Sequence, residues 1–279
     1  MGFWGKSFSF DGIPCEDFRL MMYEMNDAMH SGTVFAGTKT IVEESLPSRW
    51  RPIHIGVKQD KRLEFEIVFG VDQERIDANR HMDRYEMEAI AAWLTGHDQY
   101  KILEIEQDDM RSFRYKCMIT ELSAIEYGIV PWAMKAKVTC DGPYAYMYPH
   151  VFEYKLNRDL RDVLFNESSI NGYYQPLIRY YPRSGNDTLY ISNKTDGGRE
   201  FILDLMPVSL PGSGDPSVAG TSWLMVDNEN GVITNSAGLN LYPQFNYNFF
   251  RLKRGYNELE MYGDGTLQIV CEFPINVGG

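Results

Sequence analysis

The sequence predicts a mostly β protein with two sandwich-like domains, the first of which carries one packed α-helix. Aromatic residues make up 14% of the 279 residues, and such side chains fit pleated surfaces well. Short runs of alternating apolar and polar residues recur along the chain, with Gly- and Asp-rich turns between them. Only one segment, residues 82–94, repeats its apolar residues convincingly at helical spacing.

The first half contains the clearest strand signals. Ser7–Phe10 alternates and is followed by a turn at Asp11–Gly12. Arg62–Phe69 places four apolar residues on one face and two glutamates on the other. Further strands are predicted at Tyr100–Glu106, Tyr115–Leu122 and Met134–Cys140.

The predicted helix has both a start signal and a stop signal. Asp83 and Glu86 fit a capping box, and Gly96 fits the C-terminal stop. Its single apolar stripe predicts packing on a sheet. The stripe consists of Met82, Tyr85, Ala89, Ile90, Trp93 and Leu94.

Residues 27–52 predict a long irregular arm, because Gly and Pro recur there and the apolar residues have no steady period. A domain boundary is expected near Pro149, where turn residues break the strand pattern. The expected domains are therefore a ring-forming domain at 1–149 and a β-sandwich at 150–279.

Three hairpins are predicted in the second half from Gly and Asp turns between strand-like runs. Their turns lie at 196–198, 227–231 and 263–265. In the last strand, Leu267, Ile269, Cys271 and Phe273 form the expected inward row. Residues 206–221 are rich in Pro, Gly and Ser, which favours a flexible linkage over a binding loop.

The formal net charge of −12 disfavours binding to nucleic acid or to anionic membranes through a basic patch. No apolar run is long enough for a membrane span, and the N-terminal residues lack a signal-peptide core. We therefore expect folding in the cytosol. The four cysteines are expected to be reduced and buried, at positions Cys15, Cys117, Cys140 and Cys271.

No residue pattern indicates catalysis, a metal or a cofactor. Nucleophile elbows, phosphate loops and dinucleotide fingerprints are absent, and the histidines lack metal-ligand spacing. The histidines are His30, His54, His81, His97 and His150. A cluster of carboxylates at Glu104, Glu106, Asp108 and Asp109 is interpreted as the solvated face of a strand rather than as a glycosidase pair.

Three tyrosine-rich runs leave two interpretations open. They are Tyr144–Tyr148, Tyr173–Tyr174 and Tyr180–Tyr181. Tyrosines of this kind form strand faces and subunit contacts, which we favour, or stacking platforms for sugars.

Four motifs in this order resemble the distal tail protein family of long-tailed phages. Phe8-Ser9-Phe10-Asp11-Gly12-Ile13 with Glu16-Asp17-Phe18 resembles the family's first strand and turn. The helix ending in Ala92-Trp93-Leu94, followed by the strand Tyr100–Ile105, resembles the family's short helix and the strand after that helix. The other two motifs are Val138-Thr139-Cys140-Asp141-Gly142-Pro143-Tyr144 and Leu252-Lys253-Arg254-Gly255-Tyr256-Asn257-Glu258-Leu259 with Gly263. The 27–52 arm and the 206–221 loop are not fixed by the family pattern.

This resemblance implies a non-enzymatic virion protein at the tail tip. It implies an N-terminal sandwich that forms a sixfold ring and a galectin-like or carbohydrate-module-like C-terminal sandwich that projects outward. The ring would join the tail tube protein to the tail fibre or tail-associated lysin. The outer domains could hold receptor-binding proteins, and DNA could pass through the ring. Neither catalytic nor cofactor residues carry over.

Two other functions stay open from the sequence alone. The second domain could be a module that binds host cell-wall saccharide through exposed tyrosines. A glycoside or peptidoglycan hydrolase is the third hypothesis, and the lack of a convincing acid/base pair disfavours it.

Overall fold

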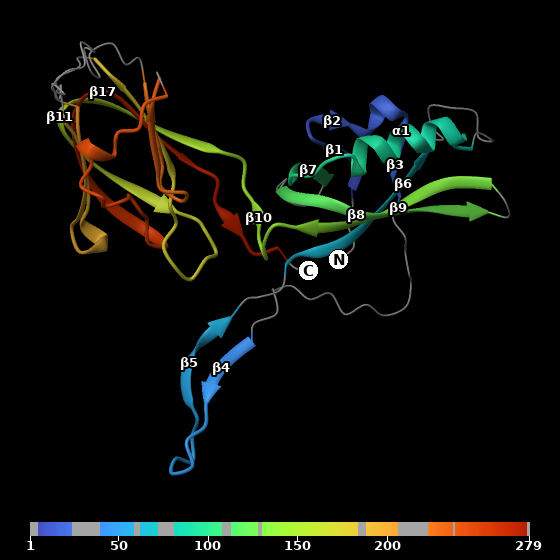
Figure 1. Cartoon of the computed structure of the whole chain (residues 1–279), viewed down its shortest axis with the longest axis horizontal. Helices are drawn as coiled ribbons and strands as arrows, with labels where there is room; N and C mark the ends of the chain where they lie inside the picture. The colour runs from blue at the N-terminus through green and yellow to red at the C-terminus, as the bar shows by residue number, and fades with distance from the viewer. Residues whose placement is uncertain are drawn as a thin grey trace. The chain divides into compact units, whose positions relative to one another are not determined.

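The computed structural model describes residues 5–23, 40–58, 62–71, 81–107, 113–127, 130–183, 188–205, 223–236 and 238–277. The chain divides into two compact units, Met1–Met147 with Asn276–Gly279 and Tyr148–Ile275. Figure 1 shows both units built almost entirely of strands, which confirms the predicted fold class. Among the described residues, α1 is the one α-helix.

One antiparallel sheet organises the first unit. Its strands lie in the order β2-β1-β7-β8-β9-β6-β3, and β10 pairs with β8. The bounds are β1 Gly5–Phe10, β2 Ile13–Pro14, β3 Leu20–Met22, β6 Glu64–Val71, β7 Lys101–Gln107, β8 Arg114–Tyr127, β9 Val130–Cys140 and β10 Ala145–Tyr146, with a 3-10 turn η1 at Cys15–Phe18. Every strand predicted in this half is present.

The local chemistry of the first unit follows its sequence closely. Asp11 and Gly12 have φ values of +53° and +78°, the positive values that a tight two-residue turn demands. In β6, Phe65 and Ile67 are buried, whereas Glu64 and Glu66 on the opposite face are exposed. The alternation therefore places one face of the strand against the core.

Helix α1 (Arg84–Thr95) packs on this sheet through Trp93. The indole ring stacks between Phe8, at a centroid distance of 5.7 Å, and Phe18, at 4.5 Å. Its Nε1–H donates to the carbonyl of Phe10 at 3.2 Å. The predicted capping box is present, because the Asp83 carboxylate accepts from the Glu86 N–H and the Glu86 carboxylate accepts from the Asp83 N–H.

The expectation of an irregular arm is wrong for residues 40–44, which form a strand, whereas residues 45–52 form the irregular connection that was expected. Strands β4 (Thr40–Glu44) and β5 (Ile53–Lys58) pair as a separate two-stranded sheet, visible in blue in Figure 1. A bulge between Val42 and Glu43 shifts the register, so the apolar residues lose the strict alternation that would reveal strands. Residues 27–39 lie outside the described residues.

The second unit contains a sheet with the order β14-β13-β17-β12-β15-β16, and β11 pairs with β17. The bounds are β11 His150–Asn166, β12 Leu177–Pro182, β13 Thr188–Asn193, β14 Arg199–Asp204, β15 Leu224–Asp227, β16 Val232–Asn235, β17 Gly255–Cys271 and β18 Pro274–Ile275, with 3-10 turns η2 at Lys194–Asp196 and η3 at Tyr242–Gln244. Two predicted hairpins, β13–β14 and β15–β16, are confirmed. The predicted inward row at the end of the chain is also buried.

The third predicted hairpin is wrong. Residues 255–271 form one continuous strand, β17, which pairs along its whole length with β11. On its other side, residues 259–262 of β17 pair with β13 and residues 265–270 pair with β12. The segment 263–265 is thus the place where β17 changes partners, not the turn of a hairpin.

Glycine is required where β17 changes partners, because atoms of β12 approach the backbone of β17 closely there. A Cβ atom on Gly263 would lie 2.9 Å from the hydroxyl oxygen of Tyr180. One on Gly265 would lie 2.3 Å from the carbonyl oxygen of Tyr181. The two glycines therefore let β12 and residues 263–265 of β17 lie against each other.

All four cysteines are free and buried, as predicted. No helix among the described residues has the length and apolarity needed to cross a bilayer. The 206–221 loop lies outside the described residues, so its predicted flexibility remains a prediction.

Replacing Trp93 with Ala is expected to lower the unfolding free energy of the first unit by about 3–5 kcal/mol, because it removes a buried ring from an aromatic stack. Urea unfolding followed by circular dichroism measures this loss. Tyr85 was predicted to lie in the packing stripe, but the structure leaves it 82% exposed. Tyr85→Ala on the same helix is therefore the control, and its change should stay within about 0.5 kcal/mol. Equal losses in both variants would contradict the packing described for α1.

Gly265→Ala is expected to destabilise the second unit by about 1–3 kcal/mol, because the added methyl group meets backbone atoms of β12. Gly172→Ala is the matched control, since nothing lies within 4 Å of its added Cβ. Thermal unfolding of both variants gives the comparison. A Gly265→Ala protein as stable as the control would show that β17 tolerates a side chain where it changes partners.

Candidate interaction surfaces

The four histidines in the described part of the chain lie in or beside different elements. His54 lies in β5, His81 precedes α1, His97 follows it and His150 begins β11, whereas His30 is outside the described residues. Throughout the described part of the chain, no three His, Cys, Asp or Glu side chains are grouped to hold a metal ion.

The carboxylates of β7 lie on a solvated strand face, as predicted. Glu104 forms an ion pair with Arg114 at 3.3 Å, and Glu106 accepts a hydrogen bond from the Ser7 hydroxyl at 2.8 Å. Leu103 and Ile105, between and beside them, are buried. Asp108 and Asp109 lie outside the described residues.

The tyrosine runs do not all face solvent. Tyr180 is fully buried, whereas its neighbour Tyr181 is exposed. Tyr174 accepts a hydrogen bond from the Glu272 N–H at 2.7 Å, and Tyr173 is exposed beside Arg251. In each pair, one tyrosine is buried or half-buried and its neighbour is exposed. This alternation is typical of strand residues that pack one side chain in the core and leave the next one in solvent.

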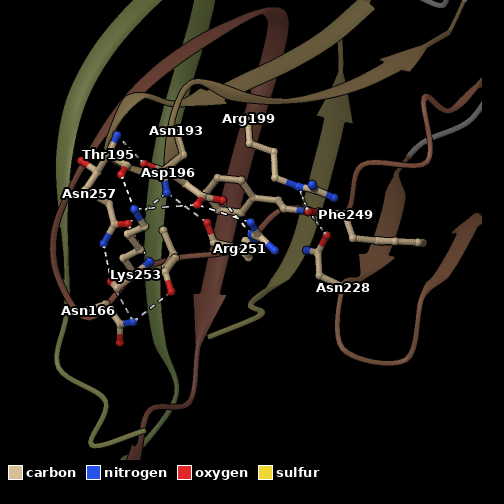
Figure 2. Close-up of polar contacts among 12 residues, drawn as sticks. Asn166, Asn193, Thr195, Asp196, Arg199, Asn228, Phe249, Arg251, Lys253 and Asn257 are labelled. Atoms are coloured by element: carbon tan, nitrogen blue, oxygen red, sulfur yellow. Dashed lines mark hydrogen bonds and ion pairs between the residues drawn. The ribbon is translucent and has the colours of Figure 1, made fainter. Parts of the chain in front are cut away.

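The densest polar cluster of the second unit surrounds the irregular segment that leads into β17. Figure 2 shows its side chains converging on this segment from several elements. Four buried asparagines pair with backbone groups here, which matters because unpaired buried backbone groups destabilise a fold. They are Asn166, Asn193, Asn228 and Asn257.

Asn257 has the most contacts in this cluster. Its side-chain nitrogen donates to the carbonyls of Lys253 at 2.7 Å and Gly255 at 2.9 Å. Its side-chain oxygen accepts from the Lys253 N–H and from the Asn193 side chain, both at 2.9 Å. These bonds hold the turn in which Gly255 has φ +88°, and they explain the Gly-x-Asn pattern at 255–257.

Asp196 is the charged centre of the cluster. Arg251 donates to it at 2.7 Å, and the same guanidinium lies 3.6 Å from the centre of the Tyr173 ring. Burial acts to raise the pKa of Asp196, but the hydrogen bonds from Arg251 and Tyr173 and the nearby positive charges outweigh it and lower the pKa. The carboxylate is therefore held in its charged form.

These polar groups bind one another and the chain's own backbone. Such a satisfied network stabilises a fold and leaves little hydrogen-bonding capacity for a ligand. We therefore interpret the Asp196–Asn257 cluster as structural. Sequence reasoning did not identify it, although Asn257 lies in the C-terminal motif.

The β4–β5 hairpin presents a different kind of surface. Ile41 is 62% exposed, Ile55 is 61% exposed and Trp50, in the connecting segment, is 84% exposed. Leu46, Ile53 and Val57 are exposed as well. An exposed apolar surface of this kind is typical of a protein interaction site.

The tip of this hairpin is also positively charged. Arg51 stacks over the Trp50 ring at 4.1 Å, and Arg49 lies on the other side of Trp50 in the sequence. Trp and Arg are enriched among residues that dominate binding energies at interfaces. The connecting segment therefore combines an aromatic anchor with two positive charges, and Glu43 and Glu44 lie beside it at the end of β4.

The chain belongs to the family described as phage tail protein N-terminal domain, which matches residues 3–142. This range covers α1 and the strands of the first unit. No curated protein sequence gives a significant match.

Solved structures extend the likeness to nearly the whole chain. The Dit (gp 19.1) protein of phage SPP1, described as a paradigm of the hub adsorption apparatus in phages that infect Gram-positive hosts, aligns with a TM-score of 0.62. The alignment covers 96% of this chain and 98% of that one at 12% identity, so it establishes a shared fold. A chain of the phage P2 baseplate aligns at 0.49 with 12% identity, covering 95% and 97%. The family model thus confirms the resemblance to phage tail proteins, the SPP1 alignment adds a fold shared with a hub protein, and the galectin-like character of the second unit stays a prediction.

The lowered pKa of Asp196 predicts acid sensitivity in the second unit. Because the folded-state pKa lies below the ordinary value of 3.8, the stability from this carboxylate is present above pH 3.8 and is lost as the pH falls through the folded-state pKa. Arg251→Ala should remove most of this contribution. Unfolding free energies measured from pH 7 to pH 2.5 should fall less steeply below pH 4 in the variant than in the wild type, and parallel curves would contradict the prediction.

Proposed function

We propose that the chain is a structural subunit that assembles into a ring at the distal end of a phage tail. Membership of a phage tail protein family supports a place in the tail. The likeness to the SPP1 hub protein, which covers both units, supports the tail-tip position. Under this proposal the protein is a non-enzymatic component of the virion, made and assembled in the host cytoplasm.

The β4–β5 hairpin is the observation that carries the ring proposal. A two-stranded hairpin without further packing is marginally stable in water, so its order needs a surface to pack on. Its exposed side chains at Ile41, Trp50 and Ile55 would be buried if the hairpin lay on a second copy. A contact from one copy to the next repeats around a closed ring.

Charge supports a second copy as the surface that receives the hairpin. The tip carries Arg49 and Arg51, whereas the chain as a whole carries a net charge of −12. Opposite charges favour encounter and register between the tip and an acidic neighbour. Sixfold symmetry is taken over from the family resemblance.

The ring would act as an adaptor. Its expected partners are the major tail tube protein on one side and the tail fibre or tail-associated lysin on the other, with receptor-binding proteins on the outward units. An acidic ring would let DNA pass without holding it, because like charges repel.

A saccharide-binding role for the second unit is the rival proposal. Its supporting observation is the exposed row on β17, where Tyr256 and Tyr262 lie on the same side of the strand and Tyr262 pairs with Tyr190 of β13. Calorimetry of the full-length protein with cell-wall saccharides tests it. Binding that disappears in a Tyr262→Ala variant would support the rival, and no binding would support the adaptor alone.

The hairpin variant Ile41→Ser/Trp50→Ala/Ile55→Ser is expected to lose the ring. Each lost interface anchor weakens association by about 2 kcal/mol, or about thirtyfold, for every contact around the ring. Light scattering coupled to size exclusion should give a multiple of the 32.2 kDa chain mass for the wild type and one chain for the variant.

Tyr256→Ala is the control for this experiment, because it removes an exposed aromatic residue from the second unit. The control should keep the ring, and both variants should keep the wild-type circular dichroism spectrum. A wild-type protein that stays monomeric at high concentration, or a hairpin variant that still forms the full ring, would contradict the proposal.

A further inference from the structure

Two of the four buried cysteines face each other across neighbouring strands. Cys117 of β8 and Cys140 of β9 are direct partners in the antiparallel register. Directly opposite residues project to the same side of a sheet, and both side chains are completely buried. Neither Cys15 in η1 nor Cys271, whose partner is His150, has a cysteine in such a position.

The backbone bonds show which kind of pair this is. The Asp141 N–H donates to the Lys116 carbonyl at 2.8 Å, so residues 116 and 141 are bonded across β8 and β9. The Cys140 N–H donates to the carbonyl of Leu63, towards β6 and away from β8. Because bonded and non-bonded pairs alternate along antiparallel strands, Cys117 and Cys140 occupy a non-hydrogen-bonded pair.

This kind of pair brings opposite side chains closest together. Its Cα atoms are typically about 4.5 Å apart, which lies within the range of about 4.4–6.8 Å found for disulfides. The typical Cβ separation is about 4.5 Å, at the upper end of the range that a disulfide needs. A bond between these two sulfur atoms therefore requires only a small closing movement of β8 towards β9.

We propose that Cys117 and Cys140 are a latent disulfide site that closes when the protein meets an oxidant. With a small-molecule disulfide as oxidant, one cysteine loses its proton and its sulfur attacks, releasing one small thiolate and leaving a mixed disulfide. The other cysteine then loses its proton and displaces the second small thiolate. Two S–H bonds are broken and one S–S bond joins β8 to β9, while the two electrons leave on the released thiolates.

Burial explains why the two thiols stay reduced until an oxidant is present in excess. Burial, and next the neighbouring charges of Cys140 and Asp141, raise the pKa of Cys117 far above its usual range. Burial, followed by the charge of Asp141, raises the pKa of Cys140 to about 12. Since the thiolate is the reacting species, both groups are protected in a reducing cytosol and react slowly outside it.

The bond would fasten the long β8–β9 hairpin of the first unit. Cross-linking this pair closes a loop of about two dozen residues, which restricts the unfolded chain and stabilises the folded one. This inference stands on the strand register and does not depend on the proposed ring.

Diamide tests the site, since it takes up two protons and two electrons from a pair of thiols. The native full-length protein is held in diamide for a day, quenched, denatured and titrated for free thiols. The count should fall from four to two without a covalent dimer on a non-reducing gel. Tryptic mapping should join the peptide 117–135 to the peptide 138–155, and the urea midpoint of the oxidised protein should rise and return after reduction.

Two variants complete the experiment. Cys140→Ala should keep all three of its thiols, and Cys271→Ala should fall from three to one. Four thiols remaining in the wild type, a different pair in the peptide map, or a covalent dimer would each overturn the proposal. Because the wild-type map alone identifies the pair, the test holds even if a variant fails to fold.

Discussion

Each sheet of this protein must cover its apolar face, and this constraint organises the whole chain. In the first unit α1 provides cover, with Trp93 stacked between Phe8 and Phe18. In the second unit β17 pairs with β11 along its whole length and, on its other edge, pairs first with β13 and then with β12, so that one long strand joins both. The β4–β5 hairpin, unlike the two larger sheets, keeps its apolar side chains exposed. The proposed function rests on this exposed surface.

The second unit shows what the constraint demands of the backbone. Where β17 changes partners, Gly263 and Gly265 have no side chain, so atoms of Tyr180 and Tyr181 can lie close to the backbone of β17. Where the chain enters β17, a buried irregular segment needs partners for its N–H and C=O groups. Asn257 and Asn193 supply them, and Asp196 with Arg251 adds a charged bond beside them. The unit is therefore stabilised by polar pairing as well as by its apolar core.

Much of the fold could be predicted from the sequence, because many strands alternate cleanly and Asp–Gly pairs mark tight turns. The same signal misled at 263–265, where glycines that permit close packing look like the residues of a hairpin turn. Strand β11 was not predicted, since its alternation is interrupted near Arg158, which has φ +77°. The β4–β5 hairpin was hidden by its bulge and by the absence of a buried face within the chain.

Interaction surfaces were harder to predict than strands for a physical reason. The Asp196–Asn257 cluster joins residues about sixty positions apart, so no local pattern reveals it. Trp50 and Ile55 indicate an interaction surface only once the structure shows that their side chains are exposed. The exposed apolar hairpin, together with the phage tail family and the shared fold, supports the proposal that each subunit is completed by its neighbour.

Hydrogen exchange of the backbone amides in β4 and β5, measured by mass spectrometry as the purified protein is diluted, tests this account most directly. If the hairpin lies on a second copy, its amides should be protected at high concentration and should exchange at nearly the unfolded rate once the particle dissociates, while the amides of β8 and β9 stay protected throughout. Rapid exchange of the hairpin within an intact particle, or equal protection in the single chain, would contradict the central claim.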